Sequence, residues 1–200
     1  MIKNKLNSFY IIDKFPKHKF YKTKLLKEIN KNIIDNRKIS DENYSDYFST
    51  DWTEDNSRIS SDFSRKWVKL IYDDLLNCFN KTFLDLGYQK CSIKDLWFQQ
   101  YRQGGTHGWH IHGGSFTGAY YLDLPKDAAP TQIVDPFNNK EIINLEVQEG
   151  DISIFPTYVV HRSPINMSKN KKTIVSFNLE FQEATDSVIK NLMASEKNEI

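Results

Sequence analysis

The chain contains few cysteines and no long apolar run. Its two cysteines among 200 residues, Cys78 and Cys91, exclude a disulfide framework and a cysteine-rich metal site. The N-terminal segment has no apolar stretch of the length that a secretory signal needs, and no later segment approaches a membrane span. We therefore expect a soluble protein of the cytoplasm, with no membrane partner.

The chain also has little net charge. The formal charge is +1 at pH 7, which argues against a protein built to bind nucleic acid. The charge is distributed unevenly, because residues 1–40 hold eleven Lys or Arg and only three Asp or Glu. This basic segment is either a solvated helix face or a contact surface for an acidic partner.

Hydrophobic residues make up 39% of the chain and aromatic residues 14%, which is enough for the core of a single domain. The N-terminal part predicts a short strand at 9–12, followed by a helix from Lys17. Ser61 and Asp62 can cap a second helix, which would end before Gly87. The polar segments 36–62 and 125–140 are expected to be loops at the rim of a binding site.

After Gly87 the helical periodicity disappears and short apolar runs alternate with turn signals. Such a series of strands is typical of a barrel or a sandwich, and helices followed by strands indicate an α+β fold. The predicted strands are Ile93–Tyr101, Phe116–Leu122, Glu141–Val147, Asp151–Phe155 and Thr173–Phe181.

Histidine and glycine are concentrated in one stretch, GGTHGWHIHGG at 104–114. If this stretch is extended, His110 and His112 point to the same face, as two ligands of one metal must. His161, after a turn that follows Pro156, is the candidate for a third ligand, whereas His107 in the glycine loop is less well placed. His18 is expected to lie on the surface. Imidazole ligands suit iron, zinc, copper and nickel, so the residues alone do not select the metal.

The last predicted strand, KTIVSFNLEF, alternates between apolar and polar residues. Lys172, Ser176 and Asn178 would share its polar face. That face is either exposed to solvent or lines the interior of a barrel. In the second case a lysine inside the barrel could bind a carboxylate.

The stretch YRQGGTHGWHIHGGSFTGAYYL, residues 101–122, resembles the Fe(II)/2-oxoglutarate-dependent oxygenases, and their prolyl-hydroxylase-like branch in particular. Later segments, EGDISIFPTYVVH and KKTIVSFN, continue the resemblance in the expected order over about residues 96–182. The resemblance implies a double-stranded β-helix (jelly-roll) core backed by N-terminal helices. It also implies a single domain, with helical support at 1–90, the catalytic core at 91–182 and a C-terminal tail at 183–200.

The resemblance further implies an Fe(II) centre and a 2-oxoglutarate site. His110 and His161 match the two iron-binding histidines of the family. Lys172 falls where the family places a basic residue that pairs with the far carboxylate of 2-oxoglutarate. Ser176 and Tyr101 match residues that assist this pairing, and Arg162 is a weaker alternative to Lys172.

The sequence departs from the family pattern at His112, which stands where the family has Asp or Glu. His112 could be a third ligand, the interpretation that we favour, and its neutral imidazole would leave more charge on the metal. Alternatively, it could turn away and leave a coordination position for water or an outside carboxylate. In a third alternative, His112 takes the role of the first ligand and Gly114 occupies the acid position.

The predicted function is therefore hydroxylation of an unactivated C–H bond in a small-molecule or peptide substrate by O2, with 2-oxoglutarate converted to succinate and CO2. Two alternatives use the same residues differently. One is a three-histidine zinc hydratase or hydrolase, and the other is a non-catalytic jelly-roll module that binds a small molecule. The sequence identifies neither the substrate nor the oligomeric state.

Overall fold

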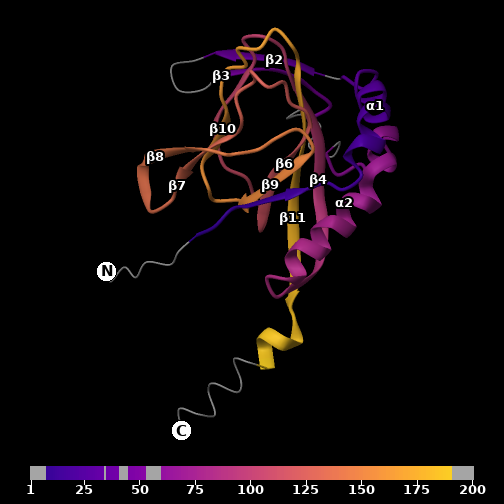
Figure 1. Cartoon of the computed structure of the whole chain (residues 1–200), viewed down its shortest axis with the longest axis vertical. Helices are drawn as coiled ribbons and strands as arrows, with labels where there is room; N and C mark the ends of the chain where they lie inside the picture. The colour runs from indigo at the N-terminus through magenta and orange to yellow at the C-terminus, as the bar shows by residue number, and fades with distance from the viewer. Residues whose placement is uncertain (1–7, 34, 41–44, 53–59, 191–200) are drawn as a thin grey trace.

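The molecule is a curled antiparallel sheet with two helices packed against one of its faces (Figure 1). We analysed a computed structural model, which describes residues 8–33, 35–40, 45–52 and 60–190. The helices are α1 (His18–Ile29) and α2 (Lys66–Leu84). No helix within these described residues is long and apolar enough to cross a membrane.

In the described part of the chain eleven strands form the sheet, and every pair of neighbours is antiparallel. Their order is β1-β9-β6-β11-β4-β3-β5-β10-β7-β8, and β2 pairs with β3 outside this path. The predicted α+β class is confirmed. The strands are β1 (Ile11–Lys14), β2 (Asp35–Ser40), β3 (Ser45–Thr50), β4 (Tyr88–Tyr101), β5 (Thr106–His110), β6 (Phe116–Asp123), β7 (Gln132–Asp135), β8 (Asn138–Asn144), β9 (Asp151–Pro156), β10 (His161–Ser163) and β11 (Lys172–Ala184).

The face of the sheet that meets the helices carries the main hydrophobic core. On β11, Val175, Phe177 and Leu179 point to this side, as the alternation of a strand requires. They pack against the apolar stripe of α2, whose members recur every fourth residue and therefore lie on one side of the helix. The stripe consists of Trp67, Ile71, Leu75, Phe79 and Phe83, all with an exposed fraction of 1% or less.

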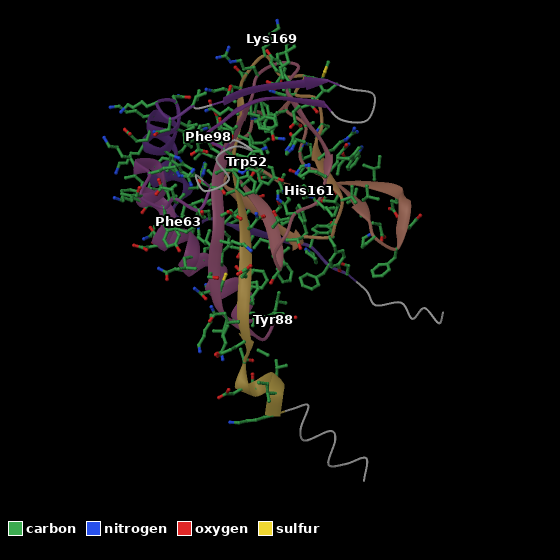
Figure 2. The ribbon with its side chains drawn as sticks, turned by 180° about the vertical axis from the view of Figure 1, so that it is seen from behind. Trp52, Phe63, Tyr88, Phe98, His161 and Lys169 are labelled. Carbon is green, nitrogen blue, oxygen red and sulfur yellow. The ribbon has the colours of Figure 1, made fainter. Side chains whose placement is uncertain are left out.

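The opposite, concave face of the long strands is polar and enclosed. In Figure 2, Phe63 and Phe98 lie on the side of the helices, whereas His161 lies on the other side of the long strands. Lys172, Ser176 and Asn178 are exposed by only 1%, 6% and 9%. The polar face of the last strand is therefore interior, which decides between the two alternatives that its pattern left open.

The ladder arranges the concave face in successive rows across β4, β11 and β6, each row two residues further along the strands. The first row holds Tyr101 and Lys172. The following rows are Gln99–Ile174–Tyr121, Trp97–Ser176–Ala119 and Asp95–Asn178–Thr117.

Two segments that we expected to be loops contain strands. Residues 36–62 include most of β2 and all of β3, and β3 pairs with both β4 and β5. The 125–140 segment contains β7, which pairs with β8, and β8 begins three residues before the predicted strand at Glu141–Val147. Besides their hairpin partners, β3 pairs with β4 and β5 and β7 pairs with β10, all distant in sequence, so the polar composition of these segments gave no strand signal.

The start of the second helix also differs from the prediction. Helix α2 begins at Lys66, and Arg65 takes the cap position without a side-chain cap. The Asp62 carboxylate instead accepts a hydrogen bond from the backbone N–H of Ser64 at 2.9 Å, which forms a turn before the helix. The short N-terminal strand and the helix predicted from Lys17 are found as β1 and α1.

A buried ion pair joins the end of the β2–β3 hairpin to α2 and β4. The Asp51 carboxylate accepts hydrogen bonds from Arg65 Nη1 at 2.5 Å, from Trp67 Nε1 at 2.8 Å and from the backbone N–H of Phe98 at 3.1 Å. Arg65 also donates to the backbone oxygens of Ser60 and Leu96. Burial raises the pKa of Asp51, while the charge of Arg65 acts in the opposite direction.

Replacement of Arg65 should therefore destabilise the protein strongly. Arg65→Leu leaves the Asp51 charge buried without its cation, and we expect the free energy of unfolding to fall by about 3–5 kcal/mol. Denaturant unfolding measures the loss. Lys69→Leu, at an exposed position of the same helix, is the control and should change stability by less than about 0.5 kcal/mol. Equal effects of the two variants would show that the ion pair does not hold the hairpin.

Candidate metal centre

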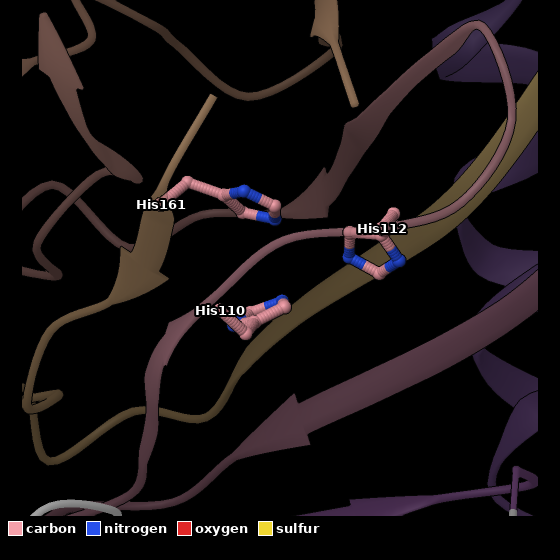
Figure 3. A group of neighbouring side chains, drawn as sticks. All are labelled: His110, His112 and His161. Carbon is pink, nitrogen blue, oxygen red and sulfur yellow. The ribbon is translucent and has the colours of Figure 1, made fainter. Parts of the chain in front are cut away.

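Three histidines converge on the concave side of the sheet (Figure 3). His110 is the last residue of β5, His112 lies in the segment after it, and His161 is the first residue of β10. The potential ligand atoms of the three side chains all lie within 4.8 Å of one another. Antiparallel pairing of β5 with β10 sets His161 directly opposite His110, and this pairing brings residues 51 positions apart to one point.

Hydrogen bonds orient two of the three rings. The Nδ1 atom of His110 lies 2.7 Å from the backbone oxygen of Gly108, and that of His161 lies 2.9 Å from the oxygen of Val159. Because a carbonyl can only accept, each Nδ1 carries the proton and each Nε2 keeps a free lone pair. This is the usual arrangement of metal-binding histidines, whose second nitrogen donates to a carbonyl or a carboxylate.

The third ring is held differently. The backbone N–H of His112 donates to the oxygen of Thr157 at 3.1 Å, which keeps this segment extended beyond the end of β5. Among the described residues no hydrogen bond reaches the His112 ring, which packs 5.6 Å from the Trp97 ring, centroid to centroid. Its direction therefore depends on packing alone.

All three imidazoles are neutral at pH 7. Burial lowers the pKa of His110, lowers that of His112 to about 3, and lowers that of His161 well below its ordinary range. The proximity of His110 contributes to the lowering in His112 and His161. A cluster of neutral imidazoles has its lone pairs available, so this donor set fits a divalent transition metal.

A fourth histidine lies beside the cluster, although we expected it in a loop. His107 belongs to β5, and its ring stacks on that of His110 with 3.8 Å between the centroids. Between the pairs His161↔His110 and Ser163↔His107 the ladder contains a β-bulge, because two residue steps on β10 oppose three on β5. The bulge turns both His107 and His110 to the same side, which strict alternation would not allow.

His107 connects the cluster to two residues that sequence reasoning missed. Its Nδ1 lies 3.0 Å from Gln99 Nε2, and its Nε2 lies 3.6 Å from Asp46 Oδ1. The Asp46 carboxylate also accepts from the backbone N–H of Gly108 at 3.2 Å. Asp46 lies on β3, inside the segment expected to be a loop, so no sequence signal placed it here.

Lys172 is buried at one end of the concave face. Its Nζ donates to the backbone oxygen of Ala129 at 2.8 Å and to Ser163 Oγ at 3.1 Å, and it lies 5.4 Å from the centroid of the Tyr101 ring. Among the residues described by the structure, no carboxylate forms an ion pair with it. Loss of hydration lowers the pKa of Lys172 to about 7. The position is therefore a buried cation site that an added anion would stabilise.

The other predicted cosubstrate residues are placed as follows. Tyr101 pairs with Lys172 in the ladder. Ser176 faces the same interior, but its hydroxyl donates to Gln99 Oε1 at 2.9 Å. Arg162 follows His161 and points to the opposite face, where its guanidinium lies 4.4 Å above the Trp109 ring and its Nε donates to Gln132 Oε1. Lys172, rather than Arg162, therefore has its side chain on the interior side.

A narrow pocket lies beside the histidine cluster and reaches Tyr101 and Ser163, which contact Lys172, although Lys172 itself does not line it. Its cavity volume is about 30 Å³, which is enough for ordered water but not for a five-carbon diacid. A diacid would therefore require the lining side chains to move apart. The lining residues are Trp97, Gln99, Tyr101, His107, His110, His112, Thr117, Gly118, Ala119, Thr131, Phe155, His161, Arg162, Ser163, Ile174 and Ser176.

His18 plays no part in this cluster and is not a simple surface residue. Its Nδ1 lies 2.7 Å from the hydroxyl of Tyr120 and its Nε2 lies 3.3 Å from the carboxylate of Glu149. The side chain is only 13% exposed. These contacts join the start of α1 to the sheet, so the role of His18 is structural.

Comparison with solved structures identifies the fold. A viral collagen prolyl hydroxylase from Paramecium bursaria Chlorella virus-1 is similar over 86% of this chain and 95% of its own, with 15% identity and a TM-score of 0.55. A prolyl hydroxylase from Trichoplax adhaerens, in complex with a peptide fragment of the hypoxia inducible factor oxygen degradation domain, is similar over 86% and 82%, with 12% identity and a TM-score of 0.60.

A third structure, the non-heme alpha-ketoglutarate-dependent carbocyclase SnoK from nogalamycin biosynthesis, is similar over 88% of this chain and 80% of its own, with 9% identity and a TM-score of 0.62. The predicted double-stranded β-helix fold is thereby confirmed. The sequence matches no family model. No curated protein sequence is similar to it.

The burial of Lys172 predicts a specific pH dependence of stability. Its folded pKa of about 7 lies below the unfolded value of about 10.5, so between these values the unfolded chain binds more protons and stability decreases as pH falls. Lys172→Met removes this penalty. We expect the variant to gain stability relative to the unchanged protein as pH falls through this window, by on the order of 3 kcal/mol at pH 7.

Denaturant unfolding of the metal-free proteins at pH 7 and at pH 10 measures this difference. Lys169→Met is the control, because Lys169 is a nearby lysine at an exposed position. If the difference in the free energy of unfolding between Lys172→Met and the unchanged protein is the same at both pH values, Lys172 stays protonated in the fold.

Proposed function

We propose that this protein is an Fe(II)- and 2-oxoglutarate-dependent oxygenase that hydroxylates a C–H bond of a small molecule or a peptide. One observation carries the proposal. The three neutral histidines and the buried lysine without a carboxylate partner among the described residues lie along one interior face of a double-stranded β-helix. A zinc hydratase would use the histidines but would give Lys172 no function.

His110, His112 and His161 would hold the metal. His110 and His161 present Nε2 in fixed directions because their Nδ1 atoms are bonded to carbonyls, and His112 would complete the set from the segment after β5. When bound, Fe(II) would supply the activation of O2, with one oxygen atom of O2 entering the substrate C–H bond and the other entering the succinate that forms, together with CO2, from 2-oxoglutarate. With three neutral ligands the protein adds no negative charge, so this centre would carry more positive charge than a site with a carboxylate ligand.

Lys172 would hold the far carboxylate of 2-oxoglutarate. An anion next to its Nζ favours the charged ammonium, so the lowered pKa of Lys172 would rise again when the diacid binds. Tyr101 faces Lys172 across the ladder, and Ser163 already bonds its Nζ. Ser176 could assist only after its hydroxyl leaves Gln99.

The pocket lining would keep water away from the reacting groups. Phe155 lies 4.8 Å from the His161 ring, centroid to centroid, and Trp97 covers His112. With Lys172 closing one end of the face, the substrate would approach from the other end. A dry site strengthens the charge interactions that position the diacid.

Anaerobic titration with Fe(II) and 2-oxoglutarate tests the proposal. We expect the weak visible charge-transfer band of the chelated complex in the unchanged protein. His110→Ala and His161→Ala should abolish stoichiometric metal binding with the fold retained by circular dichroism. Tight zinc binding without the band would indicate the zinc hydratase or hydrolase, and no metal binding would indicate a non-catalytic module.

Lys172→Met tests the cosubstrate site separately. Loss of a charge-assisted pair should weaken 2-oxoglutarate binding by about ten- to a hundredfold, measured by the midpoint of the same band. Metal affinity should be unchanged, because Lys172 is not a ligand, and Lys169→Met should bind 2-oxoglutarate normally. If the midpoint of the 2-oxoglutarate titration is unchanged in Lys172→Met, another residue must bind the far carboxylate.

A further inference from the structure

The concave face continues beyond the histidines to a polar pair, Asp95 and Asn178, that has no role in the proposed chemistry. The two residues are partners in the β4–β11 ladder and occupy the row after Trp97–Ser176–Ala119. Thr117, the third member of their row, lines the pocket that holds the histidines. Lys172 lies six residues away on β11, at the other end of the face.

Asn178 carries an unused acceptor in a buried position. Its Nδ2 donates to Asp95 Oδ2 at 2.9 Å, and this contact identifies the amide orientation, because a carboxylate cannot donate. Its Oδ1 is buried and has no hydrogen-bond partner among the residues that the structure describes, and Asn178 as a whole is only 9% exposed. Buried acceptors are nearly always paired in folded proteins, so this oxygen indicates a donor supplied from outside the chain.

Asp95 adds a negative charge to the same place. Its Oδ1 accepts from Ser60 Oγ at 2.8 Å and its Oδ2 accepts from Asn178, and each oxygen retains a second lone-pair direction. In the described part of the chain no Lys or Arg forms an ion pair with Asp95. The pair therefore offers an anionic oxygen and an amide oxygen to one donor group.

We propose that Asp95 and Asn178 bind a cationic nitrogen of the substrate, an ammonium or a guanidinium group. Such a group has several N–H donors and a positive charge, which match the amide oxygen and the carboxylate respectively. The substrate class is accordingly a free amine, such as a basic amino acid, or the basic side chain of a peptide. The assignment of this cation to a hydroxylation substrate rests on the proposed function, whereas cation binding itself does not.

The position of the pair agrees with this role. Two residues along a strand span about 7 Å, so Asp95 lies one row beyond Trp97, whose ring packs against His112. A substrate with its nitrogen at Asp95 would extend past Trp97 toward the histidines. The diacid would take the Lys172 end, so the two molecules would not compete for the same charge.

Titration with three four-carbon probes tests the charge preference: n-butylamine as its ammonium ion, n-butanol and butyrate. The indole NMR signal of Trp97 reports binding in the full chain at pH 7. We expect the ammonium to bind at least about tenfold more tightly than the alcohol and butyrate not to bind. Equal affinity for ammonium and alcohol would overturn the proposal, and this comparison needs no variant.

Asp95→Asn tests the residue itself. The substitution should abolish the preference for ammonium while preserving the indole spectrum, and an unchanged preference would overturn the assignment. Glu180→Gln is the matched control, because it removes an equal charge two residues from Asn178 at an exposed position and should bind the ammonium normally. A merely structural network between Ser60, Asp95 and Asn178 would show no charge-selective binding in any of these proteins.

Two further experiments distinguish a free amino acid from a peptide as the source of the cation, and distinguish failure of the cation site from failure of the proposed oxygenase function. Tighter binding of free lysine than of Nα-acetyl-lysine amide would identify a free amino acid as the substrate type, and the reverse order would identify a peptide. All titrations are made with metal-free protein and repeated with Fe(II) and 2-oxoglutarate under nitrogen. Cation binding without the charge-transfer band would refute the oxygenase alone, and the band without cation binding would refute the cation site alone.

Discussion

The antiparallel pairing of β5 with β10 is the constraint on which the candidate site depends. It places His161 opposite His110, and the bulge in β5 turns His107 to the same side. Both strands are short, so they depend on neighbours for support, and β3 and β7 supply it from either side. The hairpin that contains β3 is in turn joined to α2 by the buried Asp51–Arg65 pair. Helix, hairpin and histidines therefore form one connected structure.

Charge is distributed along the interior in a definite order. One end of the concave face holds Lys172, which lacks a carboxylate partner among the described residues, the middle holds neutral imidazoles, and the other end holds Asp95. A buried charge is costly unless an opposite charge or hydrogen bonds compensate it. An interior with a buried lysine at one end and a partly buried carboxylate at the other therefore favours ligands of opposite sign at its two ends. The lysine at one end and the carboxylate at the other indicate how two different molecules, a diacid and a cationic substrate, could be oriented around the histidines.

Much of the site could be predicted from local patterns. The His-x-His spacing, the turn before His161 and the polar positions of the last strand each depend on residues close in sequence. The same holds for the core face of α2, whose period is visible along the chain. Other features could not be predicted in this way. Asp46, Gln99 and the re-aimed His107 meet the cluster only because β3, β4 and β5 lie side by side and β5 contains a bulge.

The sequence by itself determined the α+β class, the alternation that separates an apolar from a polar face, and the residue types that can bind a metal. It did so because side-chain periodicity is a local property of helices and strands. Only the tertiary structure decided that the polar face is interior, that Arg162 points away while Lys172 points inward, and that Asp95 and Asn178 share the face with the histidines. These facts depend on backbone pairing between distant segments, which no local pattern of side chains records.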